Sequence, residues 1–325
     1  MRAIEVTHPG GPEVLRLIDA PLPVPRADEV RVRLHAIGVN YADVLCRRGA
    51  HPSMRQPPII VGCEGAGEVV ACGPDVTQHR VGERVGVYSP FGGAYADELV
   101  VPERYALPLP AAMAWDEAAA FTHVYLTAWH ALRTQGRATP GDWLFVSAAA
   151  GGLGGAVRQL ADAFGLQIIA GVGSDAKADA LRAAGCAHVV NYEREDLRAR
   201  LADITGGRGV DIAIETVGGR VFAAVQQALA PLARLVTVGV AGGDGPQPDV
   251  GTLLAQSASY ATLNLSVIFA RCAALIAPSW QALLALYARG ALRPQIGHRY
   301  ALAQAADAQA LMESRRSTGK IVLTP

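Results

Sequence analysis

Residues 142–164 read DWLFVSAAAGGLGGAVRQLADAF, and this stretch decides the fold. Its first part, Asp142 to Ala148, is an apolar run too short for a helix, and glycines follow soon after it. The remainder, LGGAVRQLADAF, carries apolar residues at helical spacing. The order of strand, tight turn and helix is typical of a unit in a doubly wound α/β domain.

The turn matches the dinucleotide fingerprint G-x-G-x-x-G, with Ala149, Gly151 and Gly154 in the three glycine places. Gly151 lets the backbone approach a pyrophosphate, and Gly154 lets the helix pack closely on the strand. The helix N-terminus near Leu153 offers free N–H groups and a positive dipole end. The sequence therefore predicts a dinucleotide site. The expected binding residues in the turn are Ala150, Gly151, Gly152, Leu153 and Gly154.

The residue pattern changes near residue 120. The first 120 residues are rich in Pro and Gly and contain short β-type runs, which favours a compact all-β unit. From about Ala118 onward strands and helices alternate, which favours a doubly wound parallel sheet. We expect one domain at residues 1–121, completed by residues 271–325, and an α/β domain at residues 122–270. The β-type runs are Val30 to Ala36, Gly67 to Ala71 and Arg84 to Tyr88; the later strands are Gln167 to Val172, His188 to Asn191, Val210 to Glu215 and Arg234 to Val240, with helices at Asp175 to Ala184, Trp280 to Arg289 and Ala305 to Ser314, and a last strand at Lys320 to Leu323.

Composition excludes several classes of protein. The chain has 325 residues, 51% hydrophobic and 18% charged, so it is long enough for two domains and too apolar for an intrinsically disordered protein. Its formal net charge of zero argues against nucleic acid as a partner and favours a small molecule. The five cysteines are scattered and form no C-x-x-C pair, which argues against a disulfide framework or a four-cysteine zinc lobe.

Two segments bear on localisation. The N-terminal MRAIEVTHPG has no apolar run behind a basic start, so we expect no signal peptide and a cytoplasmic protein. Val250 to Ala270 is uncharged and long enough to cross a bilayer, but it carries several polar residues. We therefore expect it to be buried soluble structure, with no membrane as a partner.

The end of the second α/β strand indicates the cofactor. An NAD site usually has an Asp or Glu there for the ribose 2′-hydroxyl, but AGVGSDAK places Gly173 and Ser174 at that point. Ser174 can donate to a 2′-phosphate, and Lys177, one of only two lysines among 29 basic residues, can add a charge-assisted bond. This pattern favours NADPH over NADH. Asp175 is the counter-argument, unless it serves only as a cap or first-turn acid of the helix.

The chain resembles the quinone oxidoreductase branch of the medium-chain dehydrogenase/reductase superfamily, the group that includes zeta-crystallin. The resemblance implies a GroES-like β domain, completed by the C-terminus, with a Rossmann NADPH-binding domain between. It rests on seven stretches in the family order: GVNYADVLCRRG (residues 38–49), PPIIVGCEGAGEVV (57–70), VGERVG, LTAWHAL, SAAAGGLGG, GVGSDAKADALRAAGCAHVVNY and SRRSTGKIVLTP.

Zinc alcohol dehydrogenases share this fold, and the resemblance allows their ligand positions to be compared. Asn40 stands where those enzymes have a catalytic Cys, Cys63 stands where they have a His, and the third ligand position falls near His123. Cys63, Glu64 and His123 could in principle form a zinc triad, since each is a legitimate ligand type. Because Asn40 is a poor replacement for a thiolate, we expect no metal site.

The candidates for catalysis are Asn40, Asp43 and His51. The resemblance implies that Asn40 approaches the nicotinamide ribose or the substrate, and an Asn can donate to a substrate oxygen; a turn-forming Asn is the alternative. The family often has a Tyr where this chain has His51, which could donate a proton near neutral pH or be an exposed loop residue. Asp43 occupies an acidic family position. Lys320 belongs to the C-terminal motif, where a structural salt bridge explains it equally well.

The remaining cofactor contacts also follow from the resemblance. Asn40 and Thr127 are expected near the nicotinamide, and Tyr192 beside the adenosine phosphate. The segment of Gly239 and Val240 is expected to pass under the nicotinamide. Phe269 falls where the family lines the pocket.

The function expected is NADPH-dependent, zinc-independent hydride transfer to quinones or other α,β-unsaturated carbonyls. One alternative is an enoyl-thioester reductase of the same superfamily, and another is a non-catalytic NADPH-binding protein of the crystallin or RNA-binding kind. The resemblance also suggests a homodimer joined through Rossmann edge strands near Asn264 to Phe269.

Overall fold

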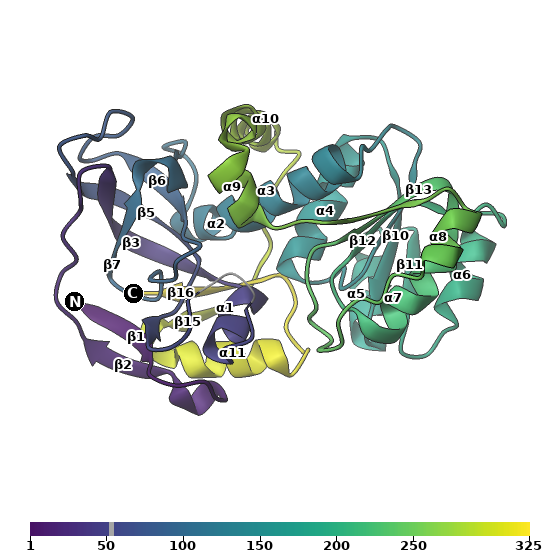
Figure 1. The fold of residues 1–325 in the computed structure, drawn as a ribbon, viewed down its shortest axis with the longest axis horizontal. Helices are drawn as coiled ribbons and strands as arrows, with labels where there is room; N and C mark the ends of the chain where they lie inside the picture. The colour runs from purple at the N-terminus through teal and green to yellow at the C-terminus, as the bar shows by residue number, and fades with distance from the viewer. Residues whose placement is uncertain (52–54) are drawn as a thin grey trace. The chain divides into compact units, whose positions relative to one another are not determined.

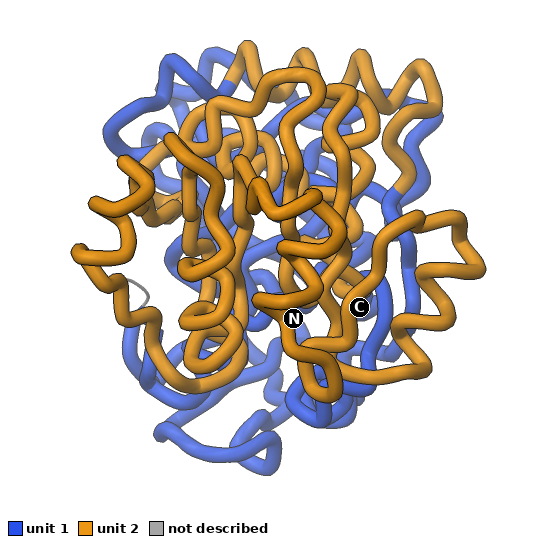
Figure 2. The backbone as a smooth tube through the Cα atoms, turned by 90° about the vertical axis from the view of Figure 1, so that its right-hand side faces the viewer, with its two compact units in different colours: residues 1–124, 269–276, 294–325 blue, residues 125–268, 277–293 orange. Residues whose placement is uncertain are grey.

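The computed structural model describes residues 1–51 and 55–325, and the chain divides into two compact units (Figure 2). Unit 1 comprises residues 1–124, 269–276 and 294–325, and unit 2 comprises residues 125–268 and 277–293. The α/β unit thus takes in residues 277–293, which the sequence assigned to the first domain.

Unit 1 is built on a mainly antiparallel sheet of seven strands, as its Pro- and Gly-rich texture predicts. The strand order is β15-β16-β3-β5-β6-β8, with β7 paired to β3, and β2-β1-β4 form a second, smaller sheet. The strands are β1 (Arg2–Val6), β2 (Arg16–Asp19), β3 (Glu29–Val39), β4 (Ile59–Ile60), β5 (Glu64–Cys72), β6 (Arg84–Tyr88), β7 (Glu98–Pro102), β8 (Ala106–Pro108), β15 (Ile296–Ala301) and β16 (Lys320–Thr324).

The helices of unit 1 are few and short. α1 (Tyr41–Arg47) follows β3 directly, α2 (Trp115–Ala119) packs on β3 and β5, and α11 (Ala305–Glu313) contacts α1 and β16. Short 3-10 turns complete this part of the chain; they are η1 (Pro12–Val14), η2 (Glu103–Tyr105), η4 (Ala273–Leu275) and η5 (Leu302–Gln304).

Unit 2 contains a six-stranded parallel sheet, ordered β11-β10-β9-β12-β13-β14 (Figure 1). In chain order this is the 3-2-1-4-5-6 arrangement of a dinucleotide-binding domain, so the strand order reverses between β9 and β12. The doubly wound fold expected from the sequence is confirmed. The strands are β9 (Trp143–Val146), β10 (Gln167–Val172), β11 (His188–Asn191), β12 (Val210–Glu215), β13 (Leu229–Thr237) and β14 (Ser259–Thr262).

Helices connect these strands and lead into and out of the sheet. They are α3 (Thr122–Trp129), continued by the π-helical turn η3 (His130–Gln135), α4 (Gly152–Ala163), α5 (Asp175–Ala183), α6 (Leu197–Ile204), α7 (Gly219–Gln226), α8 (Val250–Ala255), α9 (Leu265–Arg271) and α10 (Ile276–Ala288).

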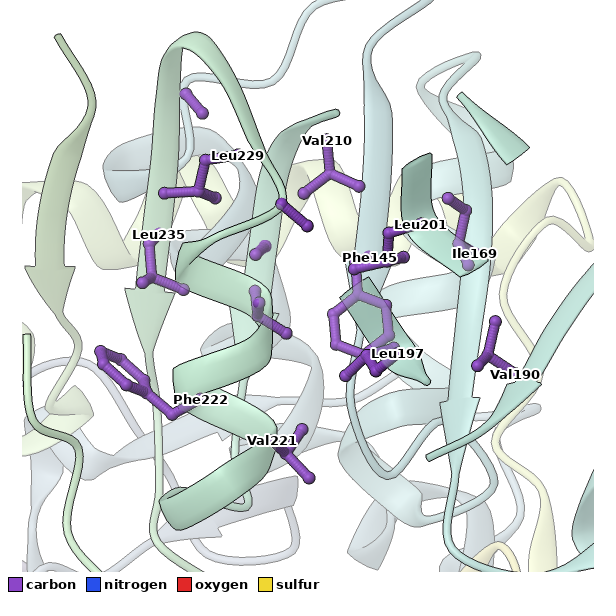
Figure 3. Packing of buried hydrophobic residues seen from close by; sticks show 14 residues of the cluster. Phe145, Ile169, Val190, Leu197, Leu201, Val210, Val221, Phe222, Leu229 and Leu235 are labelled. Atoms are coloured by element: carbon purple, nitrogen blue, oxygen red, sulfur yellow. The ribbon is translucent and has the colours of Figure 1, made fainter. Parts of the chain in front are cut away.

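The core of unit 2 lies between the sheet and the helices α6 and α7 (Figure 3). Phe145 and Ile169 of the sheet meet Leu201 of α6 and Phe222 of α7 there. Their neighbour Leu144 is equally buried but lies outside this cluster, because side chains alternate along a strand. The sheet is therefore covered on both faces, as its nearly continuous apolar strands require.

The segment 250–270 departs from the expectations. It is not a buried stretch: Val250 and Leu254 are 74% and 76% exposed. The predicted edge strand near residues 264–269 is wrong, because α9 begins at Leu265 after the side chain of Asn264 accepts the Ser266 N–H. The edge strand is instead β14, which the sequence did not reveal because it is short and polar.

Within the described residues, no single helix has the length and apolarity to span a membrane. The bent pair formed by 265–271 and 273–288 passes that test jointly, by length and composition only, with an angle of 105° at the break.

Candidate active site and cofactor site

The phosphate turn lies where β9 ends and α4 begins. Gly151 is the N-cap of α4, and the helix starts at Gly152, within one residue of the expected start. A Cβ on Gly154 would lie 2.5 Å from the carbonyl oxygen of Ala148, so the close packing expected at this glycine is present. Free N–H groups at the start of α4 can therefore face an anion beside the β9/β12 switch point.

The left-handed residue of the turn is Ala148, with φ of +49°, and not Ala149, which takes the first glycine place in the fingerprint. Ala149 is fully buried, and its N–H donates to the Gly171 carbonyl oxygen at 2.9 Å. A left-handed Ala costs roughly 1 kcal/mol or more. Such strain is typical of functional turns.

Past β10 the chain places Ser174 and Lys177 together. Ser174 is the N-cap of α5, and its Oγ accepts the backbone N–H of Lys177 at 3.4 Å. The Lys177 side chain is half-buried, and burial lowers its pKa. Asp175 is held by other groups: Asn191 Nδ2 donates to it at 2.6 Å, and Arg194 pairs with it at 2.9 Å. Ser174, not Asp175, is therefore the cap, and Asp175 is a first-turn acid engaged elsewhere.

Tyr192 lies against the same strand end. Cβ atoms on Gly171 and Gly173 would each come within 3.3 Å of its ring. Two glycines thus make room for the aromatic ring beside Ser174. The segment of Gly239 and Val240 follows the end of β13 at Thr237, three residues earlier than the predicted strand end.

Thr127 lies on α3 and carries a side-chain hydroxyl. Its Oγ1 is buried and has no hydrogen-bond partner in the described part of the chain. An unsatisfied buried hydroxyl is costly unless a ligand supplies the partner. The role of Thr127 in holding a cofactor stays a prediction.

Unit 1 contains a cluster that we name the buried polar centre: Asn40, Cys63, Glu64, His123 and Lys320. Lys320 Nζ donates to Asn40 Oδ1 at 2.5 Å and to Glu64 Oε2 at 2.7 Å. Asn40 Nδ2 donates to Glu64 Oε2 at 3.1 Å, and the backbone N–H of His123 donates to Glu64 Oε1 at 2.6 Å. Both carboxylate oxygens are thus occupied by donors.

Cys63 and His123 complete the centre. Cys63 Sγ lies 3.7 Å from His123 Nδ1 and 3.5 Å from Asn40 Nδ2. Burial, with the charges of Asp43 and Glu64, raises the pKa of the Cys63 thiol well above its usual range. Burial lowers the pKa of His123 to about 4, so the imidazole is neutral at pH 7. The ring stacks on Tyr88, with centroids 5.1 Å apart.

Asp43 lies beside the centre and is fully buried. Its Oδ2 accepts the backbone N–H of Asn40 at 2.8 Å, which caps α1, and the hydroxyl of Tyr95 at 3.2 Å. Burial raises the pKa of Asp43 from 3.8 to about 6, although the Asn40 N–H opposes the change. Asp43 therefore helps to hold the backbone of Asn40 in place. The catalytic role of Asp43 stays a prediction.

His51 and Phe269 lie in different surroundings within unit 1. Burial lowers the pKa of His51. Phe269 is buried in an aromatic cluster, with ring centroids 5.2 Å from Tyr88 and 5.1 Å from Tyr105.

The salt bridge that the sequence analysis offered for Lys320 is present, with Glu64 as its partner, but sequence reasoning did not identify that partner and did not single out Tyr95. The scarcity of lysine was a usable signal for Lys320, but its partners lie 280 and 256 residues away. Tyr95 carried no local signal. The zinc ligand positions, by contrast, could be compared from the sequence alone, because the family resemblance places them at Asn40, Cys63 and near His123.

Two family models match the chain: the alcohol dehydrogenase GroES-like domain over residues 26–111, and the zinc-binding dehydrogenase over residues 184–323. The chain is also 34% identical over 324 residues to the quinone oxidoreductase of Pseudomonas aeruginosa, a match that covers 100% of this chain and 99% of the relative. The chain belongs to the quinone oxidoreductase family of the medium-chain dehydrogenase/reductase superfamily.

The chain is also similar to two further proteins. The crystal structure of Escherichia coli quinone oxidoreductase complexed with NADPH matches with a TM-score of 0.94 and 30% identity, covering 100% of both chains. A much longer protein, a phenolphthiocerol/phthiocerol polyketide synthase polypeptide of Mycobacterium tuberculosis, is 32% identical over 99% of this chain, which corresponds to 15% of that polypeptide. The family resemblance inferred from the seven stretches is confirmed.

Proposed function

We propose that this family member is an NADPH-dependent oxidoreductase that reduces quinones or other α,β-unsaturated carbonyls without zinc. The observation that carries the proposal is the phosphate turn at the β9/β12 switch point, with Ser174 and Lys177 past the neighbouring strand. A hydroxyl and an ammonium suit a ribose 2′-phosphate, whereas an NAD site usually has a carboxylate at this point. The E. coli relative that was solved with NADPH supports the same cofactor.

The residues present fit this cofactor. The N–H groups at the start of α4 would hold the pyrophosphate, and Lys177 would pair with the 2′-phosphate. The unpartnered Oγ1 of Thr127 would bind near the nicotinamide. When bound, NADPH supplies a hydride from C4 of its nicotinamide ring.

The chain must then stabilise negative charge on the acceptor oxygen and let a proton reach it. Asn40 is our candidate for the group nearest that oxygen, and the ammonium of Lys320 lies 2.5 Å behind its amide oxygen. His51 is the candidate proton donor among the side chains. Because burial lowers its pKa, little imidazolium exists at pH 7, and solvent can supply the proton instead.

The donor set of the buried polar centre does not fit zinc, although one matching family model is that of zinc-binding dehydrogenases. A catalytic zinc ion needs three protein ligands and an open position. Glu64 already accepts bonds at both oxygens, and the Lys320 ammonium would repel a dication. Cys63 and His123 alone leave only two ligands, and the described residues hold no group of three or more ligand side chains suited to a metal.

The test is turnover of NADPH by the purified protein with a panel of quinones and enones, run in parallel with NADH. We expect NADPH oxidation that phenanthroline and EDTA do not abolish. If chelation stops the reaction and added zinc restores it, the proposal of zinc independence fails. If cofactor binds but no acceptor is reduced, the non-catalytic alternative holds.

The similarity to a polyketide synthase keeps the enoyl-thioester alternative in view. An acyl-coenzyme A substrate needs cationic groups for its phosphates. Crotonyl-coenzyme A and a simple enone of equal reactivity therefore separate the two hypotheses. A kcat/KM that is higher for the thioester by tenfold or more would favour the alternative.

We also propose a homodimer joined through unit 2, now at β14 and not at residues 264–269. β14 is one of the two edge strands of the parallel sheet, and the side chains of Leu232, Val250 and Leu254 are exposed. Exposed edges and apolar patches of this kind suit association with a second copy. Light scattering of the wild type and of Leu254→Asp tests this; a monomeric wild type would contradict it.

A further inference from the structure

Three adjacent strands bring the core of the buried polar centre together. β16 pairs with β3 so that Ile321 faces Val39, and β5 pairs with β3 so that Glu64 faces Gly38. Lys320 precedes Ile321, and Asn40 follows Val39. The sheet register therefore places Lys320, Asn40 and Glu64 at one end of three neighbouring strands.

The backbone at Gly38 has no room for a side chain. A Cβ there would lie 2.2 Å from the carbonyl oxygen of Ala119, 2.7 Å from Glu64 Oε2 and 2.9 Å from Lys320 Cε. Any side chain at this position would separate the ammonium from the carboxylate or move α2. The glycine thus makes the room that the ion pair needs.

Stability alone does not account for such an ion pair. Lys320 is 3% exposed and Glu64 is fully buried, so both ions have lost their hydration. A buried ion pair is often no better for stability than apolar side chains of similar volume. Buried charges that persist are therefore candidates for a functional role.

The contacts show on which group the pair acts. A lysine ammonium only donates, so it fixes the oxygen end of the Asn40 amide. The amino end then faces Glu64 Oε2 at 3.1 Å and the Gly38 carbonyl oxygen at 3.3 Å. The Asn40 amide is consequently locked in one orientation and polarised by a full positive charge.

We propose that Lys320 is a positioning residue for Asn40: its ammonium fixes the oxygen end of the amide and offsets the buried charge of Glu64, so that the amide keeps one orientation on the acceptor side of the reaction. This inference rests on the proposed function, since it assigns Asn40 to the acceptor side of the reaction.

The experiment compares three proteins: the wild type, Lys320→Met and the double variant Lys320→Met/Glu64→Gln. The single variant leaves the Glu64 charge unpaired and is expected to be less stable. The double variant removes both charges and should fold with stability close to that of the wild type. A control, Arg234→Met/Asp142→Asn, removes a partly buried ion pair of unit 2 whose atoms are 2.5 Å apart.

The readouts are urea unfolding, the Kd for NADPH, and kcat and KM with the best acceptor. For the double variant we expect kcat to fall about 100-fold, because the Asn40 amide is no longer held in one orientation, with Kd for NADPH within about threefold of wild type. The control pair should leave kcat within about threefold once its stability is known. A purely structural role of Lys320 predicts the opposite: the double variant would regain wild-type kcat, and this result would overturn the proposal.

A second measurement does not depend on turnover. The side-chain amide protons of Asn40, identified in a ¹H–¹⁵N spectrum by their loss in Asn40→Asp, should exchange slowly in the wild type and rapidly in the double variant. Unchanged exchange would overturn the proposal even if kcat fell, because Lys320 would not then act through Asn40. If no acceptor is reduced by the wild type, the proposed function fails, and the amide signals still decide the role of Lys320.

Discussion

The phosphate turn of unit 2 and the buried polar centre of unit 1 differ in how the chain assembles them. The turn lies within residues 147–154, and its geometry depends on backbone contacts between near neighbours, such as Gly154 against Ala148. The centre gathers Asn40, Glu64, His123 and Lys320, and its longest hydrogen bond in sequence joins residues 280 apart. One site is local and glycine-dependent, and the other depends on sheet register and buried charge. Perturbing each should therefore produce a different kind of loss.

The largest effect is expected at Gly154. In Gly154→Ala the new methyl group would meet the Ala148 carbonyl oxygen at 2.5 Å and the Ala149 Cα at 2.6 Å, so α4 must move. We expect a loss of about 3–4 kcal/mol in the free energy of unfolding, at the upper end for overpacking, and weaker NADPH binding by tenfold or more. Urea unfolding and fluorescence titration with NADPH measure both.

Gly155 supplies the control, since it is the next residue of the same helix. A Cβ there would meet nothing within 4 Å, so Gly155→Ala should stabilise the protein by about 0.5–1 kcal/mol and leave NADPH binding unchanged. Equal losses in the two variants would show that the turn is not limited by close packing. The phosphate turn would then not differ from the buried polar centre in the way proposed above.

The same contrast explains how much the sequence could predict. Strands β6, β10, β11 and β12 begin and end where the apolar runs predict, because each run is bounded by turn residues. The fingerprint located the start of α4 to within one residue. It did not indicate which residue of the turn is left-handed, since Ala148 and Ala149 carry the same side chain and only the backbone conformation distinguishes them.

The buried polar centre lay beyond such reasoning. Lys320 could be noticed as a rare lysine, but its partners depend on the pairing of β16 with β3 and of β3 with β5. Pairing between strands distant in sequence leaves no local pattern. The edge strand β14 was missed for a related reason: its residues are partly exposed and few, so their apolar signal is weak.

The second prediction concerns the pH dependence of stability at Asp43. Its pKa is about 6 in the folded chain against 3.8 when unfolded, so the folded state binds the proton more tightly. This contribution to stability is complete below pH 3.8 and is lost as the pH rises through about 6, a change of about 3 kcal/mol. Asp43→Asn keeps acceptor capacity but cannot ionise. Relative to wild type, the variant should therefore gain up to about 3 kcal/mol between pH 4 and pH 8.

Urea unfolding at several pH values measures the difference, and any constant loss from the substitution cancels. Asp75→Asn, at an exposed carboxylate of the same unit, is the matched control, and the difference for Asp43→Asn is compared with it at each pH. His123 does not disturb the comparison, because it is present in both proteins, although its lowered pKa makes stability rise with pH between about 4 and 6.5. A flat difference for Asp43→Asn would show that Asp43 is not desolvated and that the centre is wetter than its burial indicates.

A smaller effect is expected at Lys177. Lys177→Ala removes the ammonium proposed to meet the 2′-phosphate, so the ratio of kcat/KM with NADPH to that with NADH should fall about 10- to 30-fold, or about 1.4–2 kcal/mol. Arg182→Ala, at an exposed cation of the same helix that pairs with Asp179, is the control for the loss of one positive charge from α5. If Lys177→Ala left the preference for NADPH over NADH unchanged, Lys177 would not bind the 2′-phosphate, and the proposal that the end of β10 recognises NADPH would be wrong.

The smallest effect separates the two roles of Ser174. Its hydroxyl oxygen already accepts the Lys177 N–H at 3.4 Å, a long bond, while its hydrogen remains available to donate to a phosphate. Ser174→Ala removes both functions and should cost about 0.5–1 kcal/mol of stability through the lost cap. Ser174→Asp keeps the cap but places a negative charge where the 2′-phosphate is proposed to bind. If the site is for NADPH, the aspartate variant should therefore retain stability yet turn preference toward NADH, and the alanine variant should lose stability with only a severalfold change in preference. The same preference in both variants would mean that Ser174 serves the helix alone, and that recognition of the phosphate depends on Lys177 and the turn.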